Sequence, residues 1–202
     1  KALTSGLTGL GFKSRESQTG RLPYIEFAEL NLICSIGGHG KTQFAIQTQH
    51  LISHFKKISK VICAGTGGAL VDSVKPLDVV VGTKPIEFDD QEFLGCEKTL
   101  SKIKKDSTIF KTHFGPIASL DEDVVDSKRA YEIHNKTKAL IVAREGAGGA
   151  RAAAFHGLPY LEIRAASDSA NQNTDHDFNL NLNQAMKNLA EVVVCIFRRT
   201  HI

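Results

Sequence analysis

Residues 139–168 run ALIVAREGAGGARAAAFHGLPYLEIRAASD and contain a complete strand–helix–strand unit. The apolar run 139–143 predicts a buried strand, and the small residues of 146–156 predict a helix that lies close against a sheet. A Gly-Leu-Pro turn at 157–159 leads into a second predicted strand, 160–165. A strand, a helix and a second strand in this order are typical of an α/β fold with a mainly parallel sheet.

Strand and helix patterns alternate along the rest of the chain as well. We therefore expect a single domain over residues 1–202, built as a three-layer α/β sandwich with a mixed, mainly parallel central sheet flanked by helices. Residues 83–112 are polar and mixed, and part of them is expected to form a mobile loop. The other predicted strands are 31–36, 61–64, 77–81 and 117–119, and the other predicted helices are 42–55, 126–135 and 178–199.

The composition limits the class of protein. The chain has 202 residues, of which 42% are hydrophobic and 23% charged, so it can bury a core and is not a disordered or collagen-like chain. No apolar run approaches the roughly 18 residues that a membrane helix needs. The net charge of +3 is spread out, which does not favour a nucleic-acid partner. No signal peptide is visible, so we expect a cytoplasmic protein, although the start at Lys1 leaves an upstream segment open.

The metal-ligating residue types show no metal-binding pattern. The four cysteines form no CxxC pair, and three of them lie in apolar runs, which predicts buried free thiols in a reducing compartment. The histidines show no metal-ligand spacing either, so no metal site is expected. The cysteines are Cys34, Cys63, Cys96 and Cys195.

Two glycine-rich segments follow predicted strands. GGHG at 37–40 precedes a Lys-Thr pair as in a phosphate-binding P-loop, but Ser35 stands where that motif needs its first glycine. GTGG at 65–68 lacks the last glycine of the dinucleotide fingerprint, because Leu70 occupies that position. Both segments are therefore expected to be loops whose backbone can approach a ligand closely, without predicting a nucleotide cofactor.

Two carboxylates and an arginine lie at the ends of predicted strands. Glu145 lies at the end of the strand 139–143, Arg164 lies at the end of the next strand, and Asp168 comes just beyond it. Because ligands of α/β sheets bind at the carboxyl ends of strands, we expect these side chains to share one rim with the glycine loop 65–68. Taken alone, Asp168 also fits a turn or a helix cap.

Five motifs come in the order and spacing of the purine nucleoside phosphorylase superfamily. The resemblance covers the chain from about residue 3 to its end, and within the superfamily the chain looks most like 5′-methylthioadenosine/S-adenosylhomocysteine nucleosidases. It implies hydrolysis of the N-glycosidic bond of a purine nucleoside or thionucleoside, no cofactor, and a homodimer or a higher homo-oligomer. The motifs are GGHGK at 37–41, GTGGAL at 65–70, LDVV at 77–80, EGA at 145–147 and RAASD at 164–168.

The resemblance also assigns roles to individual residues. Asp168 matches the family's general acid, which donates a proton to N7 of the leaving purine, and Ser167 matches the neighbour that steadies this acid. Glu145 matches the residue that accepts hydrogen bonds from the ribose 2′ and 3′ hydroxyls. Thr66 and Arg164 match residues that position the attacking water. The other expected substrate contacts are Gly65, Gly67, Val124 and Arg144.

Three positions depart from the family pattern. Alignment by spacing puts Gly6 where the nucleosidases carry a glutamate near the end of the first strand, which helps to activate water. Either Glu16 or another residue replaces it, or the first strand is incompletely represented, or turnover is slow. Asp123 stands in place of the aromatic residue that stacks on the purine. Arg144 stands in place of a methionine, and its cation could recruit a phosphate or carboxylate of the ligand.

The nucleophile is indicated by the resemblance as well. Bacterial-type phosphorylases hold the phosphate dianion with several arginines, one of them two residues before the glycine that matches Gly65. Cys63 occupies that position here, which favours water over phosphate. The alternatives are a nucleoside phosphorylase that uses phosphate and a nucleoside-binding protein with little turnover.

Overall fold

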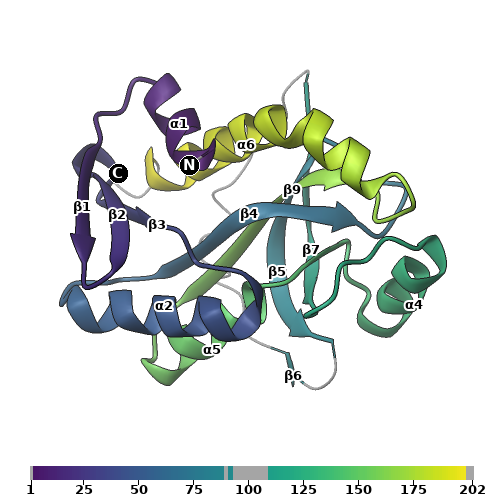
Figure 1. Ribbon diagram of the computed structural model, residues 1–202, viewed down its shortest axis with the longest axis horizontal. Coiled ribbons are helices and arrows are strands. Elements are labelled where there is room, and N and C mark those ends of the chain that lie inside the picture. The colour runs from purple at the N-terminus through teal and green to yellow at the C-terminus, as the bar shows by residue number, and fades with distance from the viewer. Residues whose placement is uncertain (1, 89–90, 93–108, 199–202) are drawn as a thin grey trace.

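The computed structural model describes residues 2–88, 91–92 and 109–198, and its centre is a six-stranded mixed sheet (Figure 1). The strand order is β6-β5-β7-β8-β4-β9, and β9 also pairs with β5. The longest ladders, β4 with β9 and β5 with β7, are parallel, whereas β4 with β8 and β5 with β9 are antiparallel. The strands are β4 (Val61–Ala69), β5 (Val79–Glu87), β6 (Gln91–Glu92), β7 (Thr112–Ser119), β8 (Ile141–Ala143) and β9 (Tyr160–Asp168).

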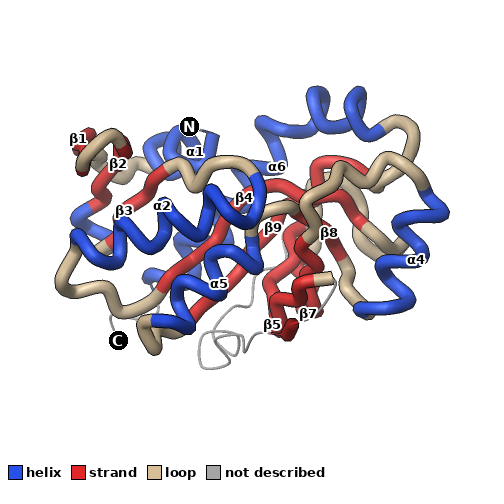
Figure 2. Tube along the Cα trace, turned by 60° about the horizontal axis from the view of Figure 1, so that its bottom comes forward, coloured by secondary structure: helices blue, strands red, loops and turns tan. Residues whose placement is uncertain are grey.

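Helices cover both sides of β4 and β9, which confirms the predicted α/β arrangement. α1 (Ala2–Gly9) and α6 (Thr174–Arg198) lie on one side, and α2 (Gly40–His54) and α5 (Gly146–Phe155) lie on the other (Figures 1 and 2). α4 (Ser127–Thr137) lies beside the sheet near β7. The predicted helices 42–55, 126–135, 146–156 and 178–199 all exist, with ends shifted by a few residues.

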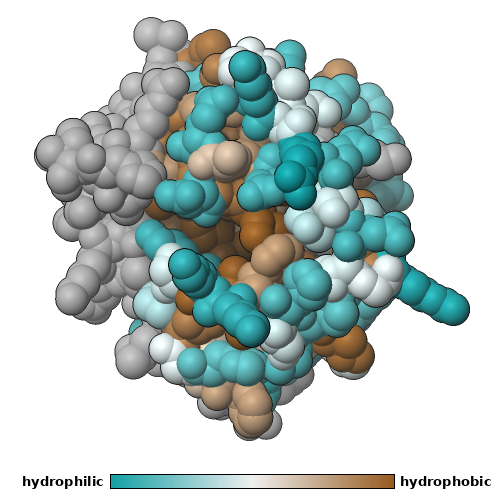
Figure 3. Space-filling model, turned by 90° about the vertical axis from the view of Figure 1, so that its left-hand side faces the viewer, coloured by the Kyte–Doolittle hydropathy of each residue, from teal (hydrophilic) through white to brown (hydrophobic). Residues whose placement is uncertain are grey.

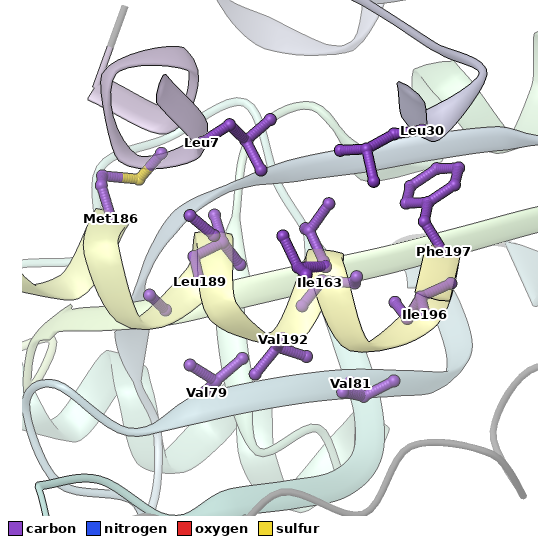
Figure 4. Close-up of a cluster of buried hydrophobic side chains, with 14 of the residues drawn as sticks. Leu7, Leu30, Val79, Val81, Ile163, Met186, Leu189, Val192, Ile196 and Phe197 are labelled. Carbon is purple, nitrogen blue, oxygen red and sulfur yellow. The ribbon is translucent and has the colours of Figure 1, made fainter. Parts of the chain in front are cut away.

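The largest core cluster lies between α6 and the sheet. One face of α6 is apolar and packs on the sheet: Met186, Leu189, Val193 and Ile196 are buried, and Leu182 is partly buried. Figure 4 shows these side chains between α1, the 3-10 turn η1 (Ala28–Leu30) and the strands. The labelled side chains are Leu7, Leu30, Val79, Val81, Ile163, Met186, Leu189, Val192, Ile196 and Phe197.

A second sheet of three antiparallel strands precedes α2. Its order is β1 (Arg15–Thr19), β2 (Leu22–Phe27) and β3 (Leu32–Ser35). The predicted strand 31–36 therefore exists, but its expected place in the main sheet is wrong. The connections between these strands are short, and short connections join antiparallel neighbours.

The predicted glycine loop 65–68 is wrong, since these residues continue β4. A Cβ atom at Gly67 would lie 2.6 Å from the Val142 carbonyl oxygen, and one at Gly65 would lie 2.8 Å from an Arg164 nitrogen. The glycines therefore provide room for neighbouring groups and not a turn. Likewise Ser167 and Asp168 are the last residues of β9, and not part of a turn.

The N-terminal residues form a helix instead of the expected first strand. Gly6 lies in α1, where a Cβ atom would be 2.8 Å from the Cβ atom of Ala190 on α6. Gly6 thus packs between two helices and is not at the end of a strand. Part of the segment 83–112 belongs to β5, β6 and β7. The remainder expected as a mobile loop (residues 89–90 and 93–108) and Cys96 lie outside the described residues.

The two sheets are separated by a cavity. Within the described ranges β3 pairs only with β2, and a cavity of about 560 Å³ lies between β3, β4, α2 and the end of α6. Figure 3 views this side of the molecule and shows a hollow with hydrophobic walls. None of the helices in the described part of the chain is long and apolar enough to cross a membrane.

Candidate active site

A larger cavity of about 970 Å³ lies between the two sheets, next to Glu145, which precedes α5. Its volume is at the upper end of the range of small-molecule sites. It is bordered by the end of β8, the middle of β4, the middle and end of β9, and the segment 122–125 that precedes α4. Every residue predicted for the site borders this cavity: Gly65, Thr66, Gly67, Val124, Arg144, Glu145, Arg164, Ser167 and Asp168.

Asp168 is held at one end of the cavity by three hydrogen bonds. Its side chain is buried, and the Ser167 hydroxyl donates to Oδ2 over 2.7 Å. The backbone N–H of Ala170 and the Thr174 hydroxyl donate to Oδ1 over 2.9 Å and 3.3 Å. A Cβ atom at Gly68 would lie 2.9 Å from Oδ1, so only a glycine on β4 leaves room for this carboxylate. Asp168 is thus fixed in place while it borders the cavity.

Glu145 is the second residue after β8 and the N-cap residue of α5. Its side chain makes no capping hydrogen bond, because the hydroxyl of Ser119 on β7 accepts from the backbone N–H of Ala147 over 2.9 Å instead. The Glu145 carboxylate instead accepts from Arg164 Nη1 over 3.2 Å through Oε2. Ser119 therefore takes the place of Glu145 as the acceptor for an N–H group at the start of α5, and the Glu145 carboxylate borders the cavity. Sequence reasoning missed this contribution of Ser119.

Arg164 lies in the middle of β9, and not at a strand end as expected. Its Nε donates to Glu162 over 2.8 Å, and Nη1 donates to the Thr66 carbonyl oxygen and to Glu145, each over 3.2 Å. Nη2 donates to Cys63 Sγ over 3.1 Å. Burial by itself would lower the pKa of Arg164, but the charges of Glu162 and Glu145 and the hydrogen bond to Glu162 raise it, so the guanidinium stays charged. Burial raises the pKa of Cys63 to about 12, so Cys63 stays a thiol.

Comparisons with known proteins identify the family of the chain. The family model described as the phosphorylase superfamily matches residues 12–198. The chain belongs to the phosphorylase superfamily. It thus shares its family with two curated proteins named 5′-methylthioadenosine/S-adenosylhomocysteine nucleosidase. The protein of Exiguobacterium is 30% identical, with 80% of this chain and 78% of the relative covered, and that of Bacillus velezensis is 26% identical, with 99% and 97% covered.

A solved structure of the superfamily shows the same fold. The nucleosidase of that name from Helicobacter pylori, crystallised with butyl-thio-DADMe-Immucillin-A, superposes with a TM-score of 0.87. The superposition covers 98% of this chain and 94% of the Helicobacter chain, at 21% sequence identity.

An ion pair lies where this superfamily member departs from the family pattern. Arg144 Nη1 is 3.2 Å from Oδ1 of Asp123, and both residues border the cavity. Arg144 Nε is buried and has no hydrogen-bond partner among the described residues. Glu16, which sequence reasoning names as a substitute for the missing glutamate, borders the same cavity from the exposed strand β1. Gly6, in contrast, is absent from the cavity wall as far as that wall is described.

The charged residues of the cavity wall are mostly acidic. Six carboxylates and two guanidinium groups border it in the described part of the chain, so the wall carries a negative excess that opposes an entering dianion. The same part of the chain holds no group of three His, Cys, Asp or Glu residues that could bind a metal ion. The acidic residues are Glu16, Glu122, Asp123, Glu145, Asp168 and Asp175, and the basic ones are Arg144 and Arg164.

Proposed function

We propose that this protein hydrolyses the N-glycosidic bond of a purine nucleoside or thionucleoside and releases the free base. The observation that carries the proposal is that Glu145 and Asp168, held on different elements, border one cavity of nucleoside size. One acid is then available to the sugar and the other to the base. The nucleosidase names of the curated relatives support the same activity.

Asp168 acts on the base. Cleavage of the C1′–N9 bond leaves electrons on the purine, and a proton donated from Asp168 to N7 makes the base a better leaving group. The Ser167 hydroxyl and the Ala170 N–H fix the carboxyl group, so that the transfer needs little reorganisation. Val124 adds an apolar contact from the segment before α4.

Glu145 acts on the sugar. Its carboxylate accepts hydrogen bonds from the ribose hydroxyls, and its negative charge favours the oxocarbenium-like transition state. Arg164 donates to Oε2 of this carboxylate and to the Thr66 carbonyl oxygen. The position of the carboxylate that contacts the sugar is therefore fixed by β9 and β4 together. Thr66 and Arg164 remain the residues that we propose to position the attacking water.

Water is the nucleophile that this cavity wall favours. Four of the five N–H donors of Arg164 are engaged by groups in the described part of the chain, Cys63 among them, which leaves one N–H of Nη2 for a water, and the wall carries an excess of carboxylates. A phosphate dianion would need unpaired cations at the same place. The function is tested by incubating the protein with a panel of purine nucleosides with and without phosphate, followed by chromatography.

We expect the free base and the free sugar, with a rate that is independent of phosphate. Ribose-1-phosphate that forms only when phosphate is added would instead establish the phosphorylase. Nucleoside binding in a calorimeter without base release at high protein concentration would establish the binding protein.

Glu145→Gln is expected to weaken both binding and turnover. The substitution removes the charge that favours the developing cation and weakens the hydrogen bonds of the sugar hydroxyls, so kcat/KM should fall about 10²-fold or more. Steady-state kinetics with the best nucleoside of the panel measure the loss. Glu132→Gln on α4, an exposed residue outside the described cavity wall, is the matched control and should keep wild-type kinetics. Unchanged kinetics in Glu145→Gln would contradict the role of Glu145 as the sugar anchor.

We further propose that the chain acts as one domain, in the cytoplasm, and as a homodimer or higher homo-oligomer, as its resemblance to the nucleosidases implies. Light scattering of the purified protein measures the oligomeric state directly.

A further inference from the structure

A glutamate is buried behind the cavity wall. The side chain of Glu162 on β9 is 0% exposed, and acidic residues are rarely buried completely unless they are paired. Its Oε1 accepts from Arg164 Nε over 2.8 Å, whereas Oε2 has no hydrogen-bond partner among the described residues. Burial raises the pKa of Glu162, and the charge of Arg164 opposes this rise. A buried carboxylate with one unsatisfied oxygen costs stability, so its pairing with Arg164 suggests a role beyond packing.

Glu162 reaches the cavity only through Arg164. Glu145 and Arg164 border the cavity in the described part of the chain, but Glu162 is not among the residues of the wall. The guanidinium is planar, so the acceptor at Nε fixes the direction of the two terminal nitrogens. One of these, Nη1, is the group that binds Oε2 of Glu145 over 3.2 Å. The orientation of Glu145 therefore depends on Glu162, which accepts from Arg164 but does not border the cavity as described.

Gly146 provides a second link between Glu162 and Glu145. A Cβ atom at Gly146 would lie 2.0 Å from Oε2 and 2.2 Å from Oε1 of Glu162. The Glu162 carboxyl group thus occupies the space beside the first residue of α5, directly after the N-cap residue Glu145. Glu162 contacts Glu145 indirectly from two sides, through Arg164 and through the helix start.

We propose that Glu162 is a positioning residue that sets sugar recognition by holding Arg164 against Glu145. The proposal rests on the proposed function of Glu145 as the sugar anchor. If Glu162 no longer holds Arg164, the guanidinium can turn, and Glu145 no longer meets the sugar hydroxyls in a fixed position. The preference for a ribonucleoside over its 2′-deoxy analogue is then the property that depends on Glu162.

The test compares the affinities for adenosine and 2′-deoxyadenosine by calorimetry, in the Asp168→Asn background so that turnover does not interfere. The parent is expected to favour adenosine about tenfold or more, because one hydrogen bond to a charged group is lost in the deoxy analogue. Glu162→Leu removes the acceptor and should bring this ratio close to one. Glu162→Gln keeps an acceptor oxygen for Arg164 Nε and should keep most of the ratio.

Several outcomes overturn the proposal. A merely structural role would weaken both ligands alike, so an unchanged ratio in a folded Glu162→Leu variant, checked by circular dichroism, contradicts it. Should the leucine variant not fold, Glu162→Asp withdraws the carboxylate by one methylene, and an unchanged ratio in that variant has the same meaning. Adding Glu162→Leu to Glu145→Gln should cause no further loss of the ratio, and an additive loss would also contradict the proposal.

Failure of the proposed function gives a different result. If the wild-type protein binds nucleosides but releases no base, hydrolysis is excluded, while the affinity ratios, then measured without the Asp168→Asn change, still test Glu162. Equal affinities of the wild-type protein for the two nucleosides would exclude the sugar contact of Glu145 and, with it, the role of Glu162.

Discussion

Asp168→Asn is expected to abolish base release while the protein still binds nucleosides. An asparagine keeps the shape of the side chain, its carbonyl oxygen can still accept from the Ala170 N–H, and its NH2 group can donate to the Ser167 hydroxyl oxygen in place of accepting from it. It cannot deliver an acidic proton to N7, so kcat should fall about 10²- to 10⁴-fold, the usual contribution of a general acid. The affinity for a nucleoside should change only a few-fold, because the sugar contact and the cavity wall are unaltered.

Single-turnover chromatography of the released base measures the rate, and calorimetry measures the affinity. Asp177→Asn, in the first turn of α6 and outside the described cavity wall, makes the same chemical change and should leave both quantities unaltered. Full activity in Asp168→Asn would remove the proposed mechanism, because no other carboxyl group has been assigned to the base. A loss of both nucleoside binding and thermal stability would instead show that the main role of Asp168 is to stabilise the turn after β9.

Much of the main sheet was predictable because apolar runs in the sequence mark its strands. The apolar runs 61–64, 77–81 and 139–143 each overlap a strand in the structure, and residues 79–81 and 141–143 are buried. In the antiparallel sheet only β3 was predicted, as the strand 31–36. β1 is polar and mostly exposed, and β2 contains a proline and a glutamate, so neither alternation nor a continuous apolar run marks these two strands clearly.

The glycines of β4 were predicted to form a loop because a glycine-rich segment has the same sequence pattern in a loop and in a closely packed strand. In a loop a glycine supplies an unusual backbone angle, whereas Gly65, Gly67 and Gly68 supply space for Arg164, a backbone carbonyl and Asp168. Only the positions of the neighbouring strands decide between these uses. The predicted rim of strand ends therefore holds for Asp168 at the end of β9, whereas Arg164 and the glycines lie within β9 and β4.

The ion pair of Glu162 with Arg164 could have been predicted from the sequence. A single acid among apolar neighbours on a strand that is buried along its whole length stands out, and an arginine two residues later lies on the same side of the strand. The spacing alone therefore predicts an ion pair on one face of β9. The further contacts with Glu145 and Gly146 depend on the packing of α5, which the sequence does not encode locally.

Gly148→Ala is expected to destabilise the whole protein. In a free helix, alanine in place of glycine would stabilise by about 0.5–1 kcal/mol. Here a Cβ atom at Gly148 would lie 2.1 Å from the backbone carbonyl oxygen of Lys41, where α5 crosses α2. A backbone atom at the start of α2 cannot rotate away as a side chain can, so the two helices must separate. We expect a net loss of about 1–3 kcal/mol in the free energy of unfolding.

Urea unfolding followed by circular dichroism measures the loss. Gly9→Ala at the end of α1 is the matched control, because nothing lies within 4 Å of its added Cβ atom. That variant should unfold like the wild-type protein or at slightly higher urea. Equal stability of Gly148→Ala and Gly9→Ala would show that α2 and α5 have room for a methyl group between them. Because α5 begins directly after Glu145, a folded Gly148→Ala variant should also lose nucleoside affinity, whereas Gly9→Ala should not.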